Sequence, residues 1–531
     1  MHLADNSLIV LSTSELQAKT HIAGPQSLFV SNAPFANTGL WQPVKHLYKS
    51  MPLTTNPRDP KELLLAVPVD QSVGKGTAKS PSAPFLQSYN IQAGRHISRQ
   101  ALTRNLATES NIDADWNKLE VPDVKLMQIS HDGLWLATSE EWMPPARDVA
   151  YLAGDKAGVE AERIKRRETY LKIWHWNGDA QSWSLNTRIA NPHADHRNEL
   201  ANRTVHLAAH PTRNAFATIG EDNKVRIWRP RTRSGQTAWF AKSVTELGQS
   251  AMLSEEALDS SLPLNSPHNR LAYSNDGSIL AVCLQNKSLS TSSVIQLLNS
   301  ESGKVRATET GVVTGDLVAM GFLDRYLILV SDELRVWDIV LGTIVFTRAL
   351  GQGATVTSQR MATTHLAVSE RSKSFAVAGL AIADDHEGSA VLVFKPIEAK
   401  PAASYILRAG AVSGLTALSD GTGYAVLDSQ AEIRTFTTHV VPVIGAPKGA
   451  VTNQAGDGAE ALQISIAKEE DDEAPPGADK SGRMPAIEDE PQNIKSEELA
   501  KIFATGSGGL GLPNVKDMFD GVASLFAVRA R

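Results

Sequence analysis

Four histidines lie close together near the middle of the sequence and could in principle hold a metal ion. They are His193, His196, His206 and His210. Zinc sites on helices use closely spaced histidine pairs, often with a glutamate as the base. Here the histidines fall in an expected loop and an expected strand, without an obvious carboxylate partner. We therefore expect turn and surface histidines, and neither a metal nor another cofactor.

The stretch GKGTAKS, which starts at Gly74, shares glycine, lysine and serine with phosphate-binding loops. It lacks the spacer that such loops place between the first glycine and Gly-Lys-Ser/Thr. A flexible loop is the better interpretation. A patterned set of carboxylates or histidines that would converge on a catalytic centre is also missing from the sequence. The sequence therefore predicts a protein that is not an enzyme.

Two basic clusters could contact phosphate groups or a partner. The first cluster, in ERIKRRETY, consists of Arg163, Lys165, Arg166 and Arg167, and the second, in VRIWRPRTR, supplies Arg229, Arg231 and Arg233. Phosphate contact needs only local positive charge. The first cluster lies in an insertion between two expected strands, and insertions in proteins built from repeats usually project from one face as binding elements. A solvated, charged loop remains the alternative for either cluster.

The stretch IGEDNKVRIW, from Ile219, reads as a strand, a tight turn and a second strand. Asp222 and Asn223 suit a hairpin turn that requires positive φ. In WD repeats, a turn aspartate, a strand threonine and a tryptophan share a hydrogen-bond network within the blade. The matching residues here are Thr218, Asp222 and Trp228, and a second group is Asp332, Trp337 and Asp338. We interpret both groups as structural.

Apolar runs separated by Asp, Asn, Gly and Ser turns recur with a loose period of about 40 residues, which is typical of propeller blades. The sequence thus predicts an all-β, WD40-type β-propeller of about seven blades over residues 1–445. The last group of strands has about three members, whereas strand-forming residues near the N-terminus have no blade of their own. We expect residues 1–22 to complete the last blade, because closure removes free sheet edges.

The composition excludes several classes of protein. The 531 residues carry a net charge of −6, so the whole molecule is not an electrostatic nucleic-acid binder, and any RNA contact is local. A single cysteine, Cys283, excludes a disulfide framework within the chain and fits a reducing compartment. The sequence contains no apolar run long enough to span a membrane. The first residues do not have the pattern of a signal peptide.

The composition changes after about residue 446. Residues 446–495 are acidic and rich in proline, which predicts a disordered linker. Residues 496–531 predict a tail of short helices, with Ser496 as a possible cap of the first. Four apolar residues share one face of the second expected helix at helical spacing: Met518, Phe519, Val522 and Phe526. A short helix with so apolar a face is expected to dock on a partner.

The central block from YLKIWHWNGD to EDNKVRIWRPR resembles the second propeller of one fungal family of WD-repeat nucleolar proteins. This is the U-three-protein-seventeen, or Net-one-associated nuclear protein, family. The opening LADNSLIVLSTSEL and the ending SEELAKIFATGSGGLGLPNVKDMFDGVASLF are also similar to it. The family carries two tandem propellers. This chain opens in mid-pattern and holds only the second, which indicates a fragment or a truncated gene model.

The resemblance implies a non-enzymatic scaffold subunit of the UtpA complex within the small-subunit processome. It implies partners among the other UtpA-type subunits, the U-three snoRNP, and the 5′ external transcribed spacer of pre-ribosomal RNA. It also implies a nucleolar location within the nucleus, roles in pre-ribosomal RNA processing and small-subunit biogenesis, and a link to RNA polymerase I transcription. A generic WD-repeat adaptor, such as a ubiquitin-ligase substrate receptor or a trafficking coat subunit, is the alternative.

Overall fold

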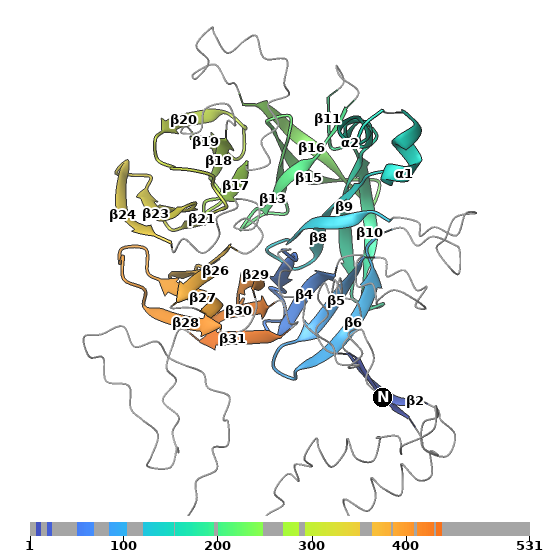
Figure 1. Ribbon diagram of the computed structural model, residues 1–531, viewed down its shortest axis with the longest axis horizontal. Coiled ribbons are helices and arrows are strands. Elements are labelled where there is room, and N and C mark those ends of the chain that lie inside the picture. Colours follow the sequence, from blue (N-terminus) through green and yellow to red (C-terminus); the bar gives the residue numbers. More distant parts are fainter. Residues whose placement is uncertain are drawn as a thin grey trace, which may run out of the picture. The chain divides into compact units, whose positions relative to one another are not determined.

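The computed structural model describes residues 7–11, 18–23, 50–67, 84–103, 121–152, 154–195, 200–247, 269–285, 293–350, 364–383, 386–407, 411–428 and 432–437. The chain divides into residues 1–464 and 465–531, and all of the described residues belong to the first part. Within them, six four-stranded sheets and one three-stranded sheet form the blades of a seven-bladed β-propeller. Figure 1 shows these blades arranged in a ring. The predicted all-β propeller is confirmed. The linker and tail expected over residues 446–531 lie outside the described residues.

The blades follow one another along the chain, and each is an antiparallel sheet whose strands are paired in sequence order. Blade 1 comprises β3 (Leu53–Thr55), β4 (Glu62–Val67), β5 (Phe85–Asn90) and β6 (Arg95–Ala101). Blade 2 comprises β7 (Asp123–Ile129), β8 (Trp135–Trp142), β9 (Glu168–Asn177) and β10 (Ser182–Ala190). Blade 3 comprises β13 (Thr204–Ala209), β14 (Phe216–Gly220), β15 (Lys224–Arg233) and β16 (Gln236–Glu246).

The remaining four blades complete the ring. Blade 4 comprises β17 (Arg270–Tyr273), β18 (Ile279–Gln285), β19 (Ser293–Asn299) and β20 (Val305–Thr310). Blade 5 comprises β21 (Ala319–Leu323), β22 (Tyr326–Val330), β23 (Glu333–Asp338) and β24 (Thr343–Ala349). Blade 6 comprises β25 (His365–Ser369), β26 (Ser374–Ala383), β27 (His386–Phe394) and β28 (Ala403–Leu407). Blade 7 comprises β29 (Val412–Ala417), β30 (Gly423–Asp428) and β31 (Ile433–Thr437).

Burial changes from the second strand of a blade to its outer strand. Every residue of β14 and of β30 is buried, whereas most residues of β20 and β24 are exposed. The second strand has a neighbouring blade on each face, so its sequence is a short continuous apolar run. The outer strand faces solvent over much of its surface and carries more polar residues.

The hydrophobic core is divided into clusters that lie between adjacent blades. One cluster, for example, joins Trp135 and Ile173 of blade 2 to Phe216, Trp228 and Trp239 of blade 3. Packing between blades therefore holds the ring together, because each sheet buries both of its faces against its neighbours.

The ring closes where blade 7 meets blade 1. Leu427 of β30 packs in one cluster with Leu63 and Phe85 of blade 1. The backbone N–H of Met51 donates to the carbonyl oxygen of Ser413 at 2.8 Å. Apolar packing and hydrogen bonds between the first and last blades thus join the two ends of the ring.

The strands near the N-terminus differ from the prediction that residues 1–22 complete the last blade. β1 (Ser7–Leu11) and β2 (Ala18–Ala23) pair with each other in a two-stranded antiparallel sheet, and the described part of blade 7 has three strands. A hairpin between neighbouring strands closes only a short loop, so it costs less chain entropy than pairing with a strand at the far end of the propeller.

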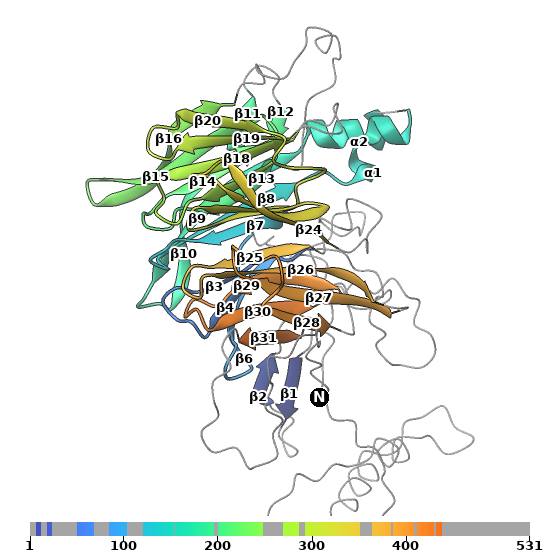
Figure 2. The same ribbon diagram turned by 90° about the vertical axis from the view of Figure 1, so that its left-hand side faces the viewer.

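Two small elements interrupt the succession of blades around blades 2 and 3. An insertion between β8 and β9 contains α1 (Ala146–Val149), the 3-10 helix η1 (Ala150–Leu152) and α2 (Lys156–Lys165). The hairpin of β11 (His193–Asp195) and β12 (Leu200–Asn202) precedes blade 3. Figure 2 shows α1 and α2 together beside the blades, and it shows the β15–β16 hairpin extending beyond neighbouring strands. The basic cluster at the end of α2 therefore lies in an insertion between the second and third strands of a blade, as predicted.

Candidate functional site

A hydrogen-bond network crosses blade 3 and contains all three residues of the first predicted WD group. The indole Nε1 of Trp228 donates to Oγ1 of Thr218 at 2.9 Å. Oγ1 of Thr218 also lies 2.9 Å from Nε2 of His193, and Nδ1 of His193 lies 2.9 Å from Oδ1 of Asp222. These distances fit an arrangement in which the threonine donates to Nε2 and the imidazole donates from Nδ1 to the carboxylate. Nη1 of Arg226 also contacts Nδ1 and lies beside the same carboxylate.

His193 is the member of this network that sequence reasoning missed. We expected turn and surface histidines, but the side chain of His193 is completely buried. Burial lowers the pKa of His193, which keeps the ring neutral, while the hydrogen bond with Asp222 opposes this shift. A Cβ atom on Gly220 would lie 2.4 Å from this imidazole, so the ring requires glycine there. The signal in the sequence was Pro192-His193, which stands where a WD repeat usually begins with Gly-His.

The turn of blade 3 has a positive φ at one of the two residues for which the sequence predicted it, Asn223, and not at Asp222. Asn223 has a φ of 53°, in the left-handed region that asparagine tolerates better than most residues. Arg226 donates to Oδ2 of Asp222 at 2.7 Å. Burial alone would raise the pKa of Asp222, but hydrogen bonds from His193 and Arg226 bring it below its usual value. The carboxylate therefore stays ionised and ties the turn to the network.

In other blades, the positions that correspond to Thr218 and Trp228 carry either a hydrogen-bonding pair or an apolar pair. In blade 2, Nε1 of Trp174 donates to Oγ1 of Thr138 at 3.0 Å. In blade 4, the strand registers place Leu298 at the position that Trp228 has in blade 3. Val282 takes the position of the threonine. The donor and the acceptor are thus replaced together, so neither blade buries an unpaired polar group at this position.

The second predicted group, in blade 5, has a different arrangement. Trp337 is buried in the core cluster between blades 4 and 5. Leu329 stands at the position of the threonine, so the tryptophan has no hydroxyl opposite it. Oδ1 of Asp338 accepts from the backbone N–H of Val340 at 3.0 Å and stabilises the turn after β23. Asp332 lies in the turn between β22 and β23. The group therefore acts through packing and turn formation, without the four-residue network of blade 3.

Arg167 of the first basic cluster does not lie on the surface. Its side chain is only 8% exposed and lies between two carboxylates. Nη1 is 3.4 Å from Glu141 of blade 2, and Nη2 is 3.1 Å from Glu221 of blade 3. The candidate RNA or partner contact at Arg167 is therefore buried, and its Nη atoms pair with two carboxylates, one of them 54 residues away in the chain.

The other three residues of this cluster are more accessible. Arg163 donates from Nε to the carbonyl oxygen of Pro144 at 2.8 Å and pairs with Glu160. Arg166 is exposed and forms an ion pair with Glu162 within α2. Lys165 is exposed, and the structure records no ion pair for it among the described residues. Lys165 and Arg166 therefore remain the members that could reach a phosphate.

The second basic cluster lies on the β15–β16 hairpin. Arg229 forms a two-bond ion pair with Glu301, at 3.0 and 2.7 Å, and Lys242 contacts the same carboxylate. Hydrogen bonds from Arg229 and Lys242 lower the pKa of Glu301 to about 2. Arg231 and Arg233 lie further along β15, are exposed, and have no recorded ion pair within the described ranges. Alternation along the strand places these three arginines on one face.

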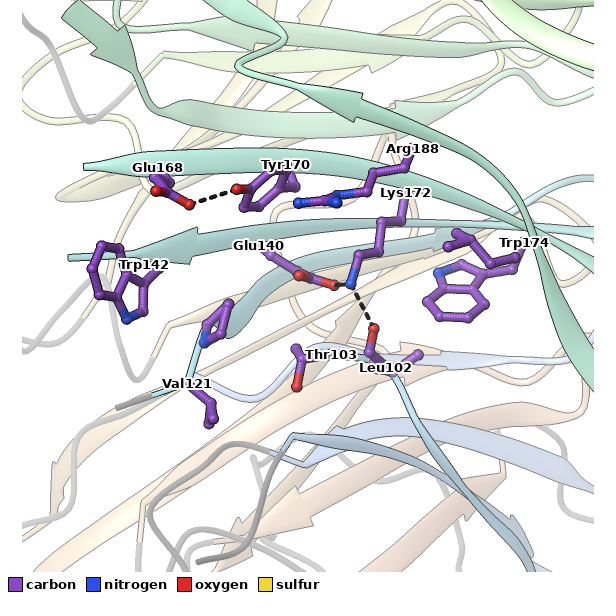
Figure 3. Close-up of a pocket in the computed structure, with 12 residues that line it drawn as sticks. Leu102, Thr103, Val121, Glu140, Trp142, Glu168, Tyr170, Lys172, Trp174 and Arg188 are labelled. Atoms are coloured by element: carbon purple, nitrogen blue, oxygen red, sulfur yellow. Dashed lines mark hydrogen bonds and ion pairs between the residues drawn. The ribbon is translucent and has the colours of Figure 1, made fainter. Parts of the chain in front are cut away.

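A pocket of about 530 Å³ lies beside blade 2, at its junction with blade 1. Figure 3 shows its lining, in which Glu140 and Lys172 form a buried ion pair with 2.6 Å between Oε1 and Nζ. Lys172 also donates to the carbonyl oxygen of Leu102 at 3.0 Å. Burial raises the pKa of Glu140, and the positive charge of Lys172 partly offsets this shift. No feature of the sequence pointed to this pocket.

Several residues named in the sequence analysis lie outside the residues that the structure describes, and others lie in surroundings that differ from those expected. The helix face of Met518, Phe519, Val522 and Phe526 falls outside the described residues, as do His196 and Gly74. His206 and His210 belong to blade 3 and the turn after β13, and burial lowers the pKa of both. No group of three potential metal ligands occurs among the residues that the structure describes. None of the helices described there has the length and apolar character needed to cross a membrane.

Comparison with known proteins gives matches to a family and to individual proteins. Residues 85–412 match the family described as the second beta-propeller of WD repeat-containing protein 75. The protein named U3 small nucleolar RNA-associated protein 17, from Schizosaccharomyces pombe (strain 972 / ATCC 24843), is 23% identical over 354 residues. That alignment covers 66% of this chain and 39% of the relative, so the chain matches well under half of the relative's length.

A solved structure described as the crystal structure of the mitotic checkpoint complex contains a chain with a TM-score of 0.42 and 13% sequence identity. The alignment covers 76% of this chain and 96% of the chain in that structure.

The family match extends from β5 of blade 1 to the start of β29 in blade 7, and so spans more than half of the sequence. This chain therefore belongs to the family of the second β-propeller of WD repeat-containing protein 75.

Proposed function

We propose that this chain is a non-enzymatic scaffold in ribosome biogenesis, acting as a UtpA-type subunit of the small-subunit processome. The observation that carries the proposal is the family match over residues 85–412, together with a relative whose name associates it with the U3 small nucleolar RNA. In this role the propeller holds pre-ribosomal RNA and neighbouring subunits in place during RNA processing. The proposal includes a nucleolar location and a contribution to transcription by RNA polymerase I.

The RNA-contacting part of the proposal rests on exposed cations. Arg231 and Arg233 extend along the β15–β16 hairpin, and Lys165 and Arg166 lie at the end of α2. Exposed cations can bind phosphate oxygens in any sequence context. Lys165, Arg231 and Arg233 have no recorded ion pair within the described ranges, whereas Arg166 would exchange its pair with Glu162 for a phosphate. The partner RNA proposed is the 5′ external transcribed spacer. Arg167, and Arg229 with its bound carboxylate, position these elements and do not touch RNA.

The terminal segment is proposed to bind a second protein subunit. The apolar residues Met518, Phe519, Val522 and Phe526 recur at helical spacing, and such a face suits a hydrophobic groove. A flexible acidic linker over residues 446–495 would give this helix a reach of roughly 40 Å. The helix would then tie the propeller to another UtpA-type subunit.

The proposal is tested by the location and the partners of the tagged chain in cells. Nucleolar enrichment, with recovery of U3 small nucleolar RNA and pre-ribosomal RNA after crosslinking, is the expected result. A uniform cytoplasmic distribution without recovery of either RNA would contradict it. Recovery of ubiquitin-ligase subunits in place of these RNAs would favour a generic WD-repeat adaptor.

A further inference from the structure

The pocket between blades 1 and 2 has no role in the contacts proposed so far. Its floor is one face of β9, because Tyr170, Lys172 and Trp174 alternate along that strand. Blade 1 contributes Leu102, which follows β6. Its volume of about 530 Å³ lies within the roughly 300–1,000 Å³ that is typical of ligand sites. The site is therefore a lateral cavity between two blades.

The walls of this pocket favour a bulky apolar group. Trp142 and Trp174 supply aromatic surface, and Leu185 lines the pocket while 47% of its surface remains exposed. Exposed apolar surface in a concave site is stabilised when a ligand covers it. Thr103 adds a buried hydroxyl for which the structure gives no hydrogen-bond partner. Within the described part of the chain, this hydroxyl is therefore available to a ligand.

The charges in the pocket favour an acidic group beside the apolar one. The charge of Lys172 is neutralised by Glu140 at 2.6 Å. The guanidinium of Arg188 lies 4.2 Å from the ring centre of Tyr170, is exposed, and has no ion pair recorded among the described residues. The carboxylate of Glu168 accepts a hydrogen bond from the Tyr170 hydroxyl. Figure 3 shows Glu168 and Arg188 on opposite sides of that ring, so the two ends of the rim differ in charge.

We propose that this pocket binds a short segment of a partner protein in which a bulky apolar side chain is followed by an acidic residue. The apolar side chain enters between Trp142 and Trp174, and the carboxylate pairs with Arg188. The inference deepens the proposed scaffold function and rests on it, because it names the chemistry by which one face of the propeller holds a protein partner. The proposed binding site lies between blades 1 and 2, and it is separate from the basic β15–β16 hairpin of blade 3.

The test uses the full chain and two dye-labelled, acetylated and amidated peptides, Ser-Gly-Phe-Asp-Gly-Ser and Ser-Gly-Phe-Lys-Gly-Ser. Fluorescence polarisation measures their affinities, and fluorine NMR of fluorotryptophan-labelled protein shows whether Trp142 and Trp174 respond. The expected result is that the aspartate peptide binds at least about tenfold more tightly, the size of effect that one anchoring contact commonly has. Both tryptophan signals should shift during its titration.

Substitutions then separate the two halves of the pocket. Arg188→Glu should reverse the preference between the peptides, and Trp142→Ala should weaken both by about tenfold or more. Arg306→Glu on β20 and Phe240→Ala on β16 are the controls, because they change an exposed arginine and an exposed aromatic residue on other blades. Thermal melting of each variant verifies the fold. The controls should leave both affinities unchanged.

Three results would overturn the inference. The first is that neither peptide shifts the two tryptophan signals, and the second is that the lysine peptide binds as tightly as the aspartate peptide. The third is that replacing residues 104–120 with a glycine-serine linker raises peptide affinity tenfold, which would make this connecting segment the natural occupant. Each result leaves the nucleolar location and the RNA recovery untouched, so failure here differs from failure of the proposed function.

Discussion

The imidazole Nδ1 of His193 lies 2.9 Å from Oδ1 of Asp222, and this contact joins the β11–β12 hairpin to the central turn of blade 3. The two residues are 29 positions apart in the chain. The side chain of His193 is fully buried and that of Asp222 is 5% exposed, and the threonine and tryptophan of the blade extend the contact into a four-residue network. The relationship explains why a histidine outside the strands of blade 3 belongs to its structure.

Asp222→Ala should lower the free energy of unfolding by about 1–3 kcal/mol. The substitution leaves the imidazole of His193 and the guanidinium of Arg226 without their buried acceptor, and an unmatched buried group costs an amount of that order. Chemical denaturation measures the change. Asp179→Ala, in the exposed turn between β9 and β10, is the matched control and should change stability by less than about 0.5 kcal/mol. Equal stability of both variants would refute a structural role.

Stability should fall as the pH is lowered from about 6.5 toward 5. Burial lowers the pKa of His193, and it lowers that of His206 to about 3, with the charge of Arg270 contributing. The unfolded chain therefore binds more protons than the folded chain in this range. Stability is complete above pH 6.5, and each histidine removes up to about 1.4 kcal/mol per pH unit below it. Thermal melting across this range measures the effect, and a flat profile would contradict the prediction.

Arg167→Ala should destabilise the propeller by about 1–3 kcal/mol, because it removes the charged partner of the half-buried Glu141 and leaves the buried Glu221 with Arg203 alone. Lys165→Ala, two residues away at an exposed position, should have an effect below about 0.5 kcal/mol. Urea unfolding of the two variants provides the comparison. An Arg167→Ala protein as stable as the Lys165→Ala protein would show that the buried ion pairs contribute little.

Replacing Arg231 and Arg233 together by glutamate should weaken binding of a single-stranded RNA oligonucleotide without altering thermal stability. The slope of log affinity against log salt concentration should decrease by about 0.7 for each phosphate contact that is lost. Titrations at several salt concentrations measure this slope. Arg306→Glu, on the outer strand of blade 4, is the control. If the control and the double variant lose the same affinity, the hairpin is not a specific contact.

Replacing Phe519 and Phe526 together by aspartate should release one protein partner in a pull-down, while the propeller keeps its melting temperature. The charges would prevent the apolar face from entering a hydrophobic groove. Ser524→Asp is the matched control, because helical spacing places residue 524 on the opposite face. Recovery of every partner at the original yield would show that the terminal segment is not an anchor.

The sequence by itself determined the local part of this structure. The spacing of short apolar runs predicted antiparallel blades and their number, since the alternation of strand and turn residues depends only on near neighbours. Asn223 adopts the positive φ that its place in a tight turn required. The insertion between β8 and β9 also occurs where the sequence indicated. Simple patterns sufficed for these features because each is formed within one blade.

Only the tertiary structure decided which distant residues meet. The hydroxyl of Thr55 donates to the carbonyl oxygen of Ala417, 362 positions away, and such contacts close the ring. In the sequence, Arg167 is one of four basic residues in a cluster. In the structure, blade 2 packs against blade 3 and places Arg167 between two carboxylates. The pocket likewise exists because the face of β9 and the end of β6 come together. Burial and charge pairing depend on the spatial neighbours of a residue, and the folded ring supplies those neighbours from separate parts of the chain.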